Sequence, residues 1–157
     1  MIFVILAVIG SVLALLHLAM QKRPRTKQRI AEVLLLYAFA FPIGLGGLVG
    51  FVGHTLRAGP VAASIGRPAG NPFQYEVAVA NLAFGVLGLL CLRFRDGFWI
   101  ATAIGWSVFM LGAAVVHLHQ IHAGQPYAPG NAGAILYFDI LAPALVVALL
   151  AIRNARN

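Results

Sequence analysis

The feature that most constrains this chain is a series of apolar runs, each long enough to cross a lipid bilayer. A helix needs about 20 predominantly apolar residues to cross roughly 30 Å of hydrocarbon. Here 61% of the residues are hydrophobic and only 10% are charged, whereas soluble domains carry about 25% charged residues. We therefore predict an all-α, polytopic membrane helix bundle that forms a single transmembrane domain over residues 1–157. Its five predicted spans are residues 1–20, 30–52, 76–92, 98–120 and 135–152.

The basic residues predict the orientation of these spans, because cytoplasmic loops carry an excess of Lys and Arg. Arg57 and Arg67 lie on one side, and nine bases lie on the other: Lys22, Arg23, Arg25, Lys27, Arg29, Arg93, Arg95, Arg153 and Arg156. We predict that the N-terminus is outside and the C-terminus is cytoplasmic. The isoelectric point of 10.6 then reflects topology and attraction to anionic lipid. The expected partner is the lipid bilayer and not nucleic acid.

The segment between the second and third spans predicts a small structured element on the outer face. Residues 53–74 are longer than a passive connection, since loops beyond about 12–15 residues are usually functional or disordered. Within them, Pro60 to Gly66 has proline near the start and glycine at the end, which is typical of a short helix. Together with the turn-rich residues 124–133, this segment is expected to form a lid over the outer end of the bundle.

Glycine and proline residues inside the spans predict close packing and kinks. Gly46 and Gly50 have the spacing that lets helix backbones approach closely in lipid. This pair suits packing within the bundle, and a dimer face is the alternative. Pro42 and Pro143 each remove a backbone donor and should kink the second and fifth spans.

Two acidic residues and several histidines are predicted to meet at the outer end of the bundle. Glu32 and Asp96 are explained as interfacial ion pairs with nearby arginines. Glu76 and Asp139 are not, and an ionisable residue within a span is by default a functional candidate. The candidate catalytic residues are Glu76 and Asp139, and the candidate metal ligands are His54, Glu76, His117 and Asp139. Around them we expect Gln74, Asn81, His119 and Asn131. A hydrogen-bond network that only ties the bundle to its lid is the competing interpretation.

Several segments resemble a known family. They are Ala63 to Glu76, which ends in Pro-Phe-Gln-Tyr-Glu, residues 81–85, and the Pro-Gly-Asn-Ala-Gly segment at 129–133. Over roughly residues 50–145 the chain is similar to a family of small bacterial membrane proteins catalogued only as a domain of unknown function. It also has a looser likeness to DoxX-type membrane proteins. The resemblance implies a helical, multi-pass protein of the bacterial inner membrane and supplies no substrate.

Three classes of function remain open. A metal-dependent or redox membrane enzyme is one, because nitrogen and oxygen ligands without thiolate suit a divalent transition metal such as Zn, Fe, Mn or Cu(II). Non-covalent haem held by two histidines is its variant. The second class is a small cation or proton carrier that uses the same residues. The third is an accessory or structural subunit, which packs against a membrane-protein partner or a second copy of the chain. A nucleotide-binding Gly-x-Gly-x-x-Gly motif and a Gly-x-Ser-x-Gly hydrolase elbow are both absent from the sequence.

Overall fold

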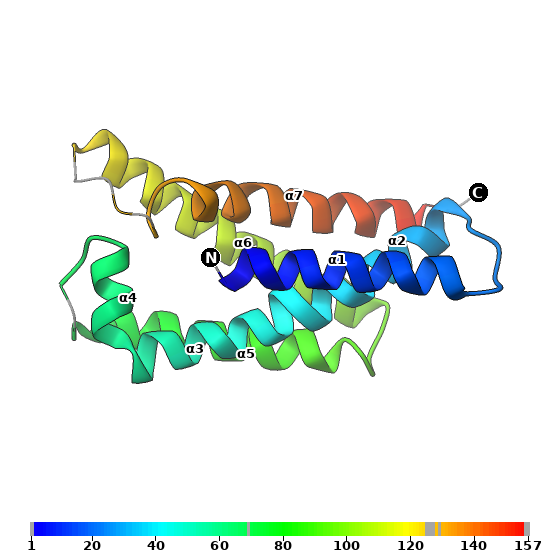
Figure 1. Cartoon of the computed structure of the whole chain (residues 1–157), viewed down its shortest axis with the longest axis horizontal. Helices are drawn as coiled ribbons and strands as arrows, with labels where there is room; N and C mark the ends of the chain where they lie inside the picture. The colour runs from blue at the N-terminus through cyan, green and yellow to red at the C-terminus, as the bar shows by residue number, and fades with distance from the viewer. Residues whose placement is uncertain (1, 69, 125–127, 129, 156–157) are drawn as a thin grey trace.

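In a computed structural model of the chain, five helical segments are long and apolar enough to cross a membrane (Figure 1). The structure describes residues 2–68, 70–124, 128 and 130–155, and within these ranges it contains helices and no strand. The prediction of an all-α bundle with five candidate spans is therefore confirmed. The spans are α1 (Ile2–Met20), the continuous segment Lys27–Leu56, α5 (Pro72–Leu90), α6 (Gly97–His122) and α7 (Ala134–Asn154).

The second span combines three helical pieces. It begins with α2 (Lys27–Ala38), passes through a wider π-helix, η1 (Phe39–Leu45), and ends as α3 (Gly46–Leu56). Pro42 lies inside η1. Because proline has no N–H group, it cannot donate the regular bond to the carbonyl four residues earlier, and a π turn is one way in which a helix accommodates that loss. At Pro42, where a kink is predicted, the span contains a π-helix, whereas Pro143 lies inside the single α-helix α7.

Capping explains why the third span begins earlier than predicted. The Asn71 side chain accepts a hydrogen bond from the Gln74 backbone N–H at 2.9 Å, and Pro72 occupies the first helical position. Both are typical of a helix start. Consequently α5 begins at Pro72 and not at residue 76, so Gln74 and Glu76 already lie in its first turns.

The short element predicted after the second span is confirmed as α4 (Ala58–Ser64). Gly66 follows it with φ +71°, and the Arg67 backbone N–H donates to the Ala62 carbonyl at 2.9 Å. Such a left-handed glycine is a common helix stop. In Figure 1, α4 stands across the end of the bundle instead of running along it. The Gly130 backbone N–H donates to the Ser64 carbonyl at 2.8 Å, which joins α4 to the segment before α7.

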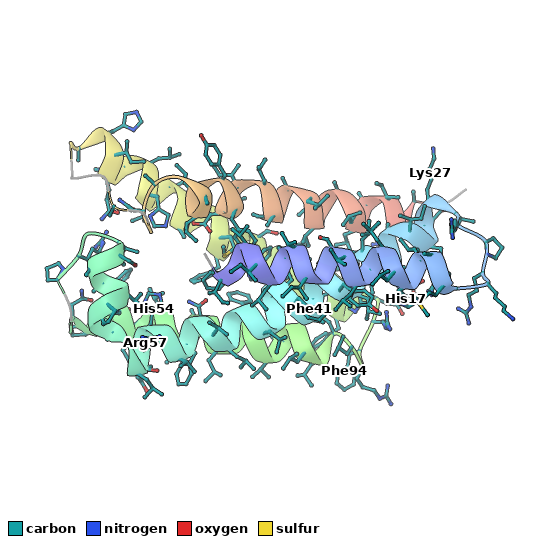
Figure 2. All side chains as sticks on the ribbon, viewed as in Figure 1. His17, Lys27, Phe41, His54, Arg57 and Phe94 are labelled. Carbon is teal, nitrogen blue, oxygen red and sulfur yellow. The ribbon has the colours of Figure 1, made fainter. Side chains whose placement is uncertain are left out.

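The two ends of the bundle differ in charge. The end that carries α4 and the segments 65–71 and 123–133 is called the lid end here. Of these two segments, residues 69, 125–127 and 129 lie outside the described residues. The opposite end is called the basic end, because the 21–26 and 91–96 connections and the end of α7 lie there (Figure 1). Figure 2 shows His54 and Arg57 at the lid end, and His17 and Lys27 at the basic end. Of the nine bases predicted to share one side, Arg156 lies outside the described residues.

The acidic residues at the basic end form ion pairs. Glu32 accepts from Arg29 at 2.8 Å, as expected, and also lies 3.8 Å from Arg95. Asp96 pairs with Arg153 of α7 at 2.7 Å, and not with the neighbouring arginines that the sequence suggested. The reason is tertiary, since α6 begins beside the end of α7. The Arg95 and Arg153 guanidinium groups also lie over the Trp99 ring, at 4.7 and 4.9 Å from its centroid.

Glycines let the second and third spans approach closely. A Cβ atom on Gly47 would lie 2.6 Å from the Gly85 nitrogen, and one on Gly88 would lie 2.6 Å from the Gly44 nitrogen. Either contact is too close for a side chain. Of the predicted pair, Gly50 faces Asn81 and Gly46 faces Phe3 of α1. The small-residue pattern is therefore used for packing within the chain.

Candidate functional site

A cavity of about 610 Å³ lies at the lid end of the bundle. All of the spans contribute to its wall, and so does α4. Its deep part is apolar and includes Phe84, Trp106 and Phe138, two of which belong to the buried core. Its polar lining residues are Asn81 and a group near the lid: His54, Ser64, Arg67, Asn71, Gln74, His117, Gln120 and Asp139. Its size and its mainly apolar lining are typical of small-molecule sites.

One wall of this cavity holds a buried carboxylate. Asp139 lies in the second turn of α7 and is 3% exposed. Its Oδ2 atom is 3.4 Å from Nε2 of His117 on α6. Nδ1 of the same imidazole contacts Oδ1 of Asn131, which is also buried. Two predicted site residues and one predicted neighbour are therefore brought together.

The polar chain continues from Asn131 to the lid. With its amide turned as its neighbours require, Gln120 donates to Asn131 Oδ1 at 2.7 Å. The Gln120 oxygen then accepts from Nη2 and Nε of Arg67 at 2.6 and 2.9 Å. The five side chains Arg67, Gln120, Asn131, His117 and Asp139 form what is called the polar relay below.

The donor and the acceptor at each contact of the polar relay follow from Arg67, its first member. A guanidinium group can only donate, so the Gln120 oxygen must face Arg67 and the Gln120 NH₂ group must donate to Asn131. The Asn131 oxygen is then an acceptor, and His117 Nδ1 must carry a proton to bond with it. The remaining contact of the relay, between His117 Nε2 and Asp139, is the one that a second imidazole proton or a carboxyl proton completes. Each member of the relay therefore has a partner within the protein.

On the opposite wall of the cavity, two buried polar atoms have no hydrogen-bond partner. Gln74 is 7% exposed, and its Nε2 group donates to the Ala58 carbonyl at 2.8 Å. That bond fixes the orientation of the amide and leaves Oε1 buried without a hydrogen-bond partner. Nδ1 of His54 on α3 is likewise buried without a partner. Both residues line the cavity.

Asn81 lies deeper on the same side. It is seven residues after Gln74 and so falls on the same face of α5, as the helical period predicts. Its Nδ2 group donates to the Val77 carbonyl at 2.9 Å, one turn earlier. Asn81 also lies against Gly50, where a Cβ atom would be 2.6 Å from its Oδ1. We conclude that Asn81 combines helix packing with a place in the cavity wall.

Glu76 and His119 lie elsewhere, and this corrects the predicted site. Glu76 is exposed and is not part of the cavity wall. It is two residues after Gln74, which on a helix is a rotation of about 200°, so the two side chains point to opposite faces. The same rule separates the exposed His119 from His117. Near the end of a span an ionised side chain can extend to the membrane interface, so Glu76 does not need a partner inside the bundle.

The predicted four-ligand metal centre is not assembled. Among the described residues, no three His, Cys, Asp or Glu side chains lie close enough together to hold a metal ion. Asp139 and His117 form a pair, whereas His54 lies on the α3 part of the wall and Glu76 lies outside the cavity. A pair of side chains falls short of the three or four protein ligands of a typical zinc site.

Two residues of the polar relay were not singled out from the sequence as site residues. Arg67 was treated only as a charge that reports topology. Gln120 carries a detectable signal, because it lies three residues after His117 and so shares its helix face. Arg67 has no comparable signal in the sequence, since its position depends on how the segment after α4 folds back onto α6.

Comparison with known proteins gives one match. The model of a family of unknown function, DUF6790, matches residues 1–157. No curated protein and no solved structure matches the chain. The match extends over the whole chain, beyond the residues 50–145 that carried the resemblance in the sequence. The chain therefore belongs to DUF6790, a family of unknown function.

Proposed function

We propose that this chain is a membrane protein that binds a small, uncharged amphipathic molecule in the cavity at its lid end. The observation that carries the proposal is the pair of buried, unpartnered polar atoms on one wall, Gln74 Oε1 and His54 Nδ1. A buried polar atom without a hydrogen bond is costly, by about 1–3 kcal/mol. Such atoms in native structures call for an explanation. A ligand that hydrogen-bonds to both atoms supplies one.

The chemistry of the ligand's head group follows from the orientation of Gln74. Because its Nε2 group is engaged by the Ala58 carbonyl, the free atom is an acceptor. The head group must therefore donate, as a hydroxyl or N–H group does. His54 Nδ1 accepts or donates according to its tautomer and so tolerates either partner. We expect a hydroxyl, which offers a donor to Gln74 and an acceptor to His54.

The rest of the ligand is expected to be apolar and without charge. The deep part of the cavity is lined by aromatic rings, which favour a hydrocarbon or ring body. The charged groups of the opposite wall already satisfy each other within the polar relay. An ionised head group would require a counter-charge that this arrangement does not leave free.

This interpretation is preferred to the other classes of function. Within the described residues a metal enzyme lacks a ligand cluster. A carrier needs a polar path toward the basic end, but there the cavity gives way to the core around Phe39, Trp99 and Trp106. We also propose that the lid end faces the outside of a bacterial inner membrane, because the basic residues lie mainly at the other end.

A matched series of probes tests the proposal. Purified protein in lipid nanodiscs is heated with 1-dodecanol, with methyl dodecyl ether or with dodecane, and the unfolding temperature is followed by circular dichroism. The alcohol donates a hydrogen bond, the ether only accepts, and the alkane does neither. A bound ligand raises the unfolding temperature in proportion to its affinity. We expect dodecanol to give the largest shift, and Gln74→Met to reduce the alcohol's shift to that of the ether.

Two results would contradict the proposal. Equal shifts with all three probes would mean that Gln74 and His54 recognise no head group. A stoichiometric transition metal in the purified protein, lost together with stability on Asp139→Ala, would return the metal hypothesis to first place.

A further inference from the structure

Part of the cavity wall on α5 and α6 is formed by exposed apolar residues. They include Phe73 on α5, which is 60% exposed, and Val108 on α6, which is 68% exposed. Val116, one turn before Gln120, is 44% exposed and lines the cavity as well. Exposed residues that line the cavity mark its openings. Those on α5 and α6 are apolar, whereas Ser64 and Pro68 are exposed on the lid side.

The two helices that border this opening contact each other on the side that faces the basic end. The Phe84 and Phe109 rings lie with their centroids 5.4 Å apart, and Gly105 lies against Phe84. Toward the lid end from this contact, the facing residues of α5 and α6 line the cavity. Gly112 is among them, and a Cβ atom added there would meet nothing within 4 Å. The α6 side of the opening is therefore widened by the absence of a side chain at residue 112.

The described part of the lid is held in place by hydrogen bonds. Arg67, which follows α4, is bound to Gln120 of α6 through two donors. The Gly130 backbone N–H is bound to the Ser64 carbonyl at the end of α4. Among the described residues, these contacts tie the lid to both α6 and the segment before α7. A molecule that came from the aqueous side would pass this hydrogen-bonded lid, whereas one in the bilayer meets the apolar side chains of Phe73, Val108 and Val116.

We infer that the ligand enters from the bilayer, through the opening between α5 and α6. It is then a membrane-dissolved, single-chain amphiphile, with its head group near Gln74 and His54. Its chain would extend toward Trp106, which lies eleven residues before His117 on α6, or about 16 Å at 1.5 Å per residue. This inference rests on the proposed function and adds a source for the ligand and a route.

Trp106 provides an internal reporter for a test. It lines the cavity and is 4% exposed, while the other tryptophan, Trp99, is 0% exposed and lies near the basic end. Dodecanol brominated at its terminal carbons, delivered from phosphatidylcholine vesicles, should quench Trp106 fluorescence when it binds. Trp106→Phe should remove this quenching, which would assign the signal to the cavity.

The decisive variant is Gly112→Phe, with Val115→Phe as its matched control. Val115 is 66% exposed on the same helix and does not line the cavity. We expect Gly112→Phe to slow quenching about tenfold, which corresponds to about 1.4 kcal/mol of barrier. Val115→Phe should leave the rate unchanged. Arg67→Ala, which frees the lid, should not accelerate binding.

The outcomes separate the two proposals. Absence of Trp106 quenching in the wild-type protein, with no dodecanol-specific thermal shift, would overturn the proposed function and this inference with it. Normal quenching in the wild type, unchanged by Gly112→Phe, would overturn only the route. So would a faster rate in Arg67→Ala, because it would place the limiting step at the lid.

Discussion

Replacing His54 by phenylalanine should stabilise the protein and weaken its binding of ligand. Nδ1 of His54 is buried without a hydrogen-bond partner, at the edge of a largely apolar cavity. Phenylalanine has a similar planar shape and removes the unpaired atom. A residue whose polar group serves only the fold should behave in the opposite way, because its removal breaks a bond. The sign of the change in stability is therefore the informative quantity.

The expected magnitude comes from the cost of an unpaired atom. A fully buried polar group without a partner costs about 1–3 kcal/mol, and His54 is only partly buried. We therefore expect the ligand-free His54→Phe protein to gain about 1 kcal/mol, at the lower limit of that range. For a chain of this length, this is a rise of about 2–4 °C in unfolding temperature. The dodecanol complex should in turn lose one hydrogen bond, or about 1 kcal/mol and roughly fivefold in affinity.

The assay is thermal unfolding in nanodiscs, with and without dodecanol, after co-purified lipid has been exchanged. His119→Phe is the control, because His119 is exposed, does not line the cavity and should change neither quantity. A fall in the unfolding temperature of His54→Phe without ligand would refute the reasoning. It would show that His54 makes a structural bond and that its free nitrogen is not kept for a ligand.

Four further predictions follow from the same structure. A reporter fused after Asn157 should be active only in the cytoplasm, and activity on the outer side would contradict the orientation inferred from the bases. Glu76→Gln should leave stability and dodecanol binding within about 0.5 kcal/mol of wild type, because Glu76 is exposed outside the cavity; a larger loss of binding would restore it to the site. Asp139→Ala should lower stability by about 1–3 kcal/mol in thermal unfolding, since it leaves His117 Nε2 without its partner. An unchanged stability would show that the contact between His117 and Asp139 does not stabilise the protein. Burial raises the pKa of the Cys91 thiol to about 11, so at pH 8 the thiol stays protonated and maleimide labelling should be slow until the protein is unfolded; rapid labelling of the folded protein would contradict this.

The architecture was predictable because hydropathy acts locally. Runs of apolar residues report spans without reference to the rest of the fold, and all five were found. The span ends were less accurate, since capping groups such as Asn71 and Pro72 extend a helix beyond its apolar stretch. The short helix α4 was also predictable, because proline near its start and Gly66 after its end mark it locally.

The level of the site along the spans was predictable from the sequence, but the orientation of each side chain was not. Residues at one level along the spans were identified, and His117, Asn131 and Asp139 do meet. The face of the helix on which each side chain lies is a separate question. For Glu76 the helical period answers it once the start of α5 is known. The contact between Arg67 and Gln120 was beyond this reasoning. It joins an irregular segment to a helix, and no periodicity describes that pairing.

The two walls of the cavity differ in a way that locates the ligand. On the α6 and α7 side, a carboxylate, an imidazole, two amides and a guanidinium group complete one another's hydrogen bonds. On the α3 and α5 side, two buried atoms have no partner. Two further buried atoms without a partner, Gln21 Nε2 and Ser107 Oγ, belong to residues that do not line the cavity, so a ligand in it would meet only the pair on Gln74 and His54. The polar relay ties the lid to α6 and α7, and the wall with Gln74 and His54 is where a ligand would add most binding free energy.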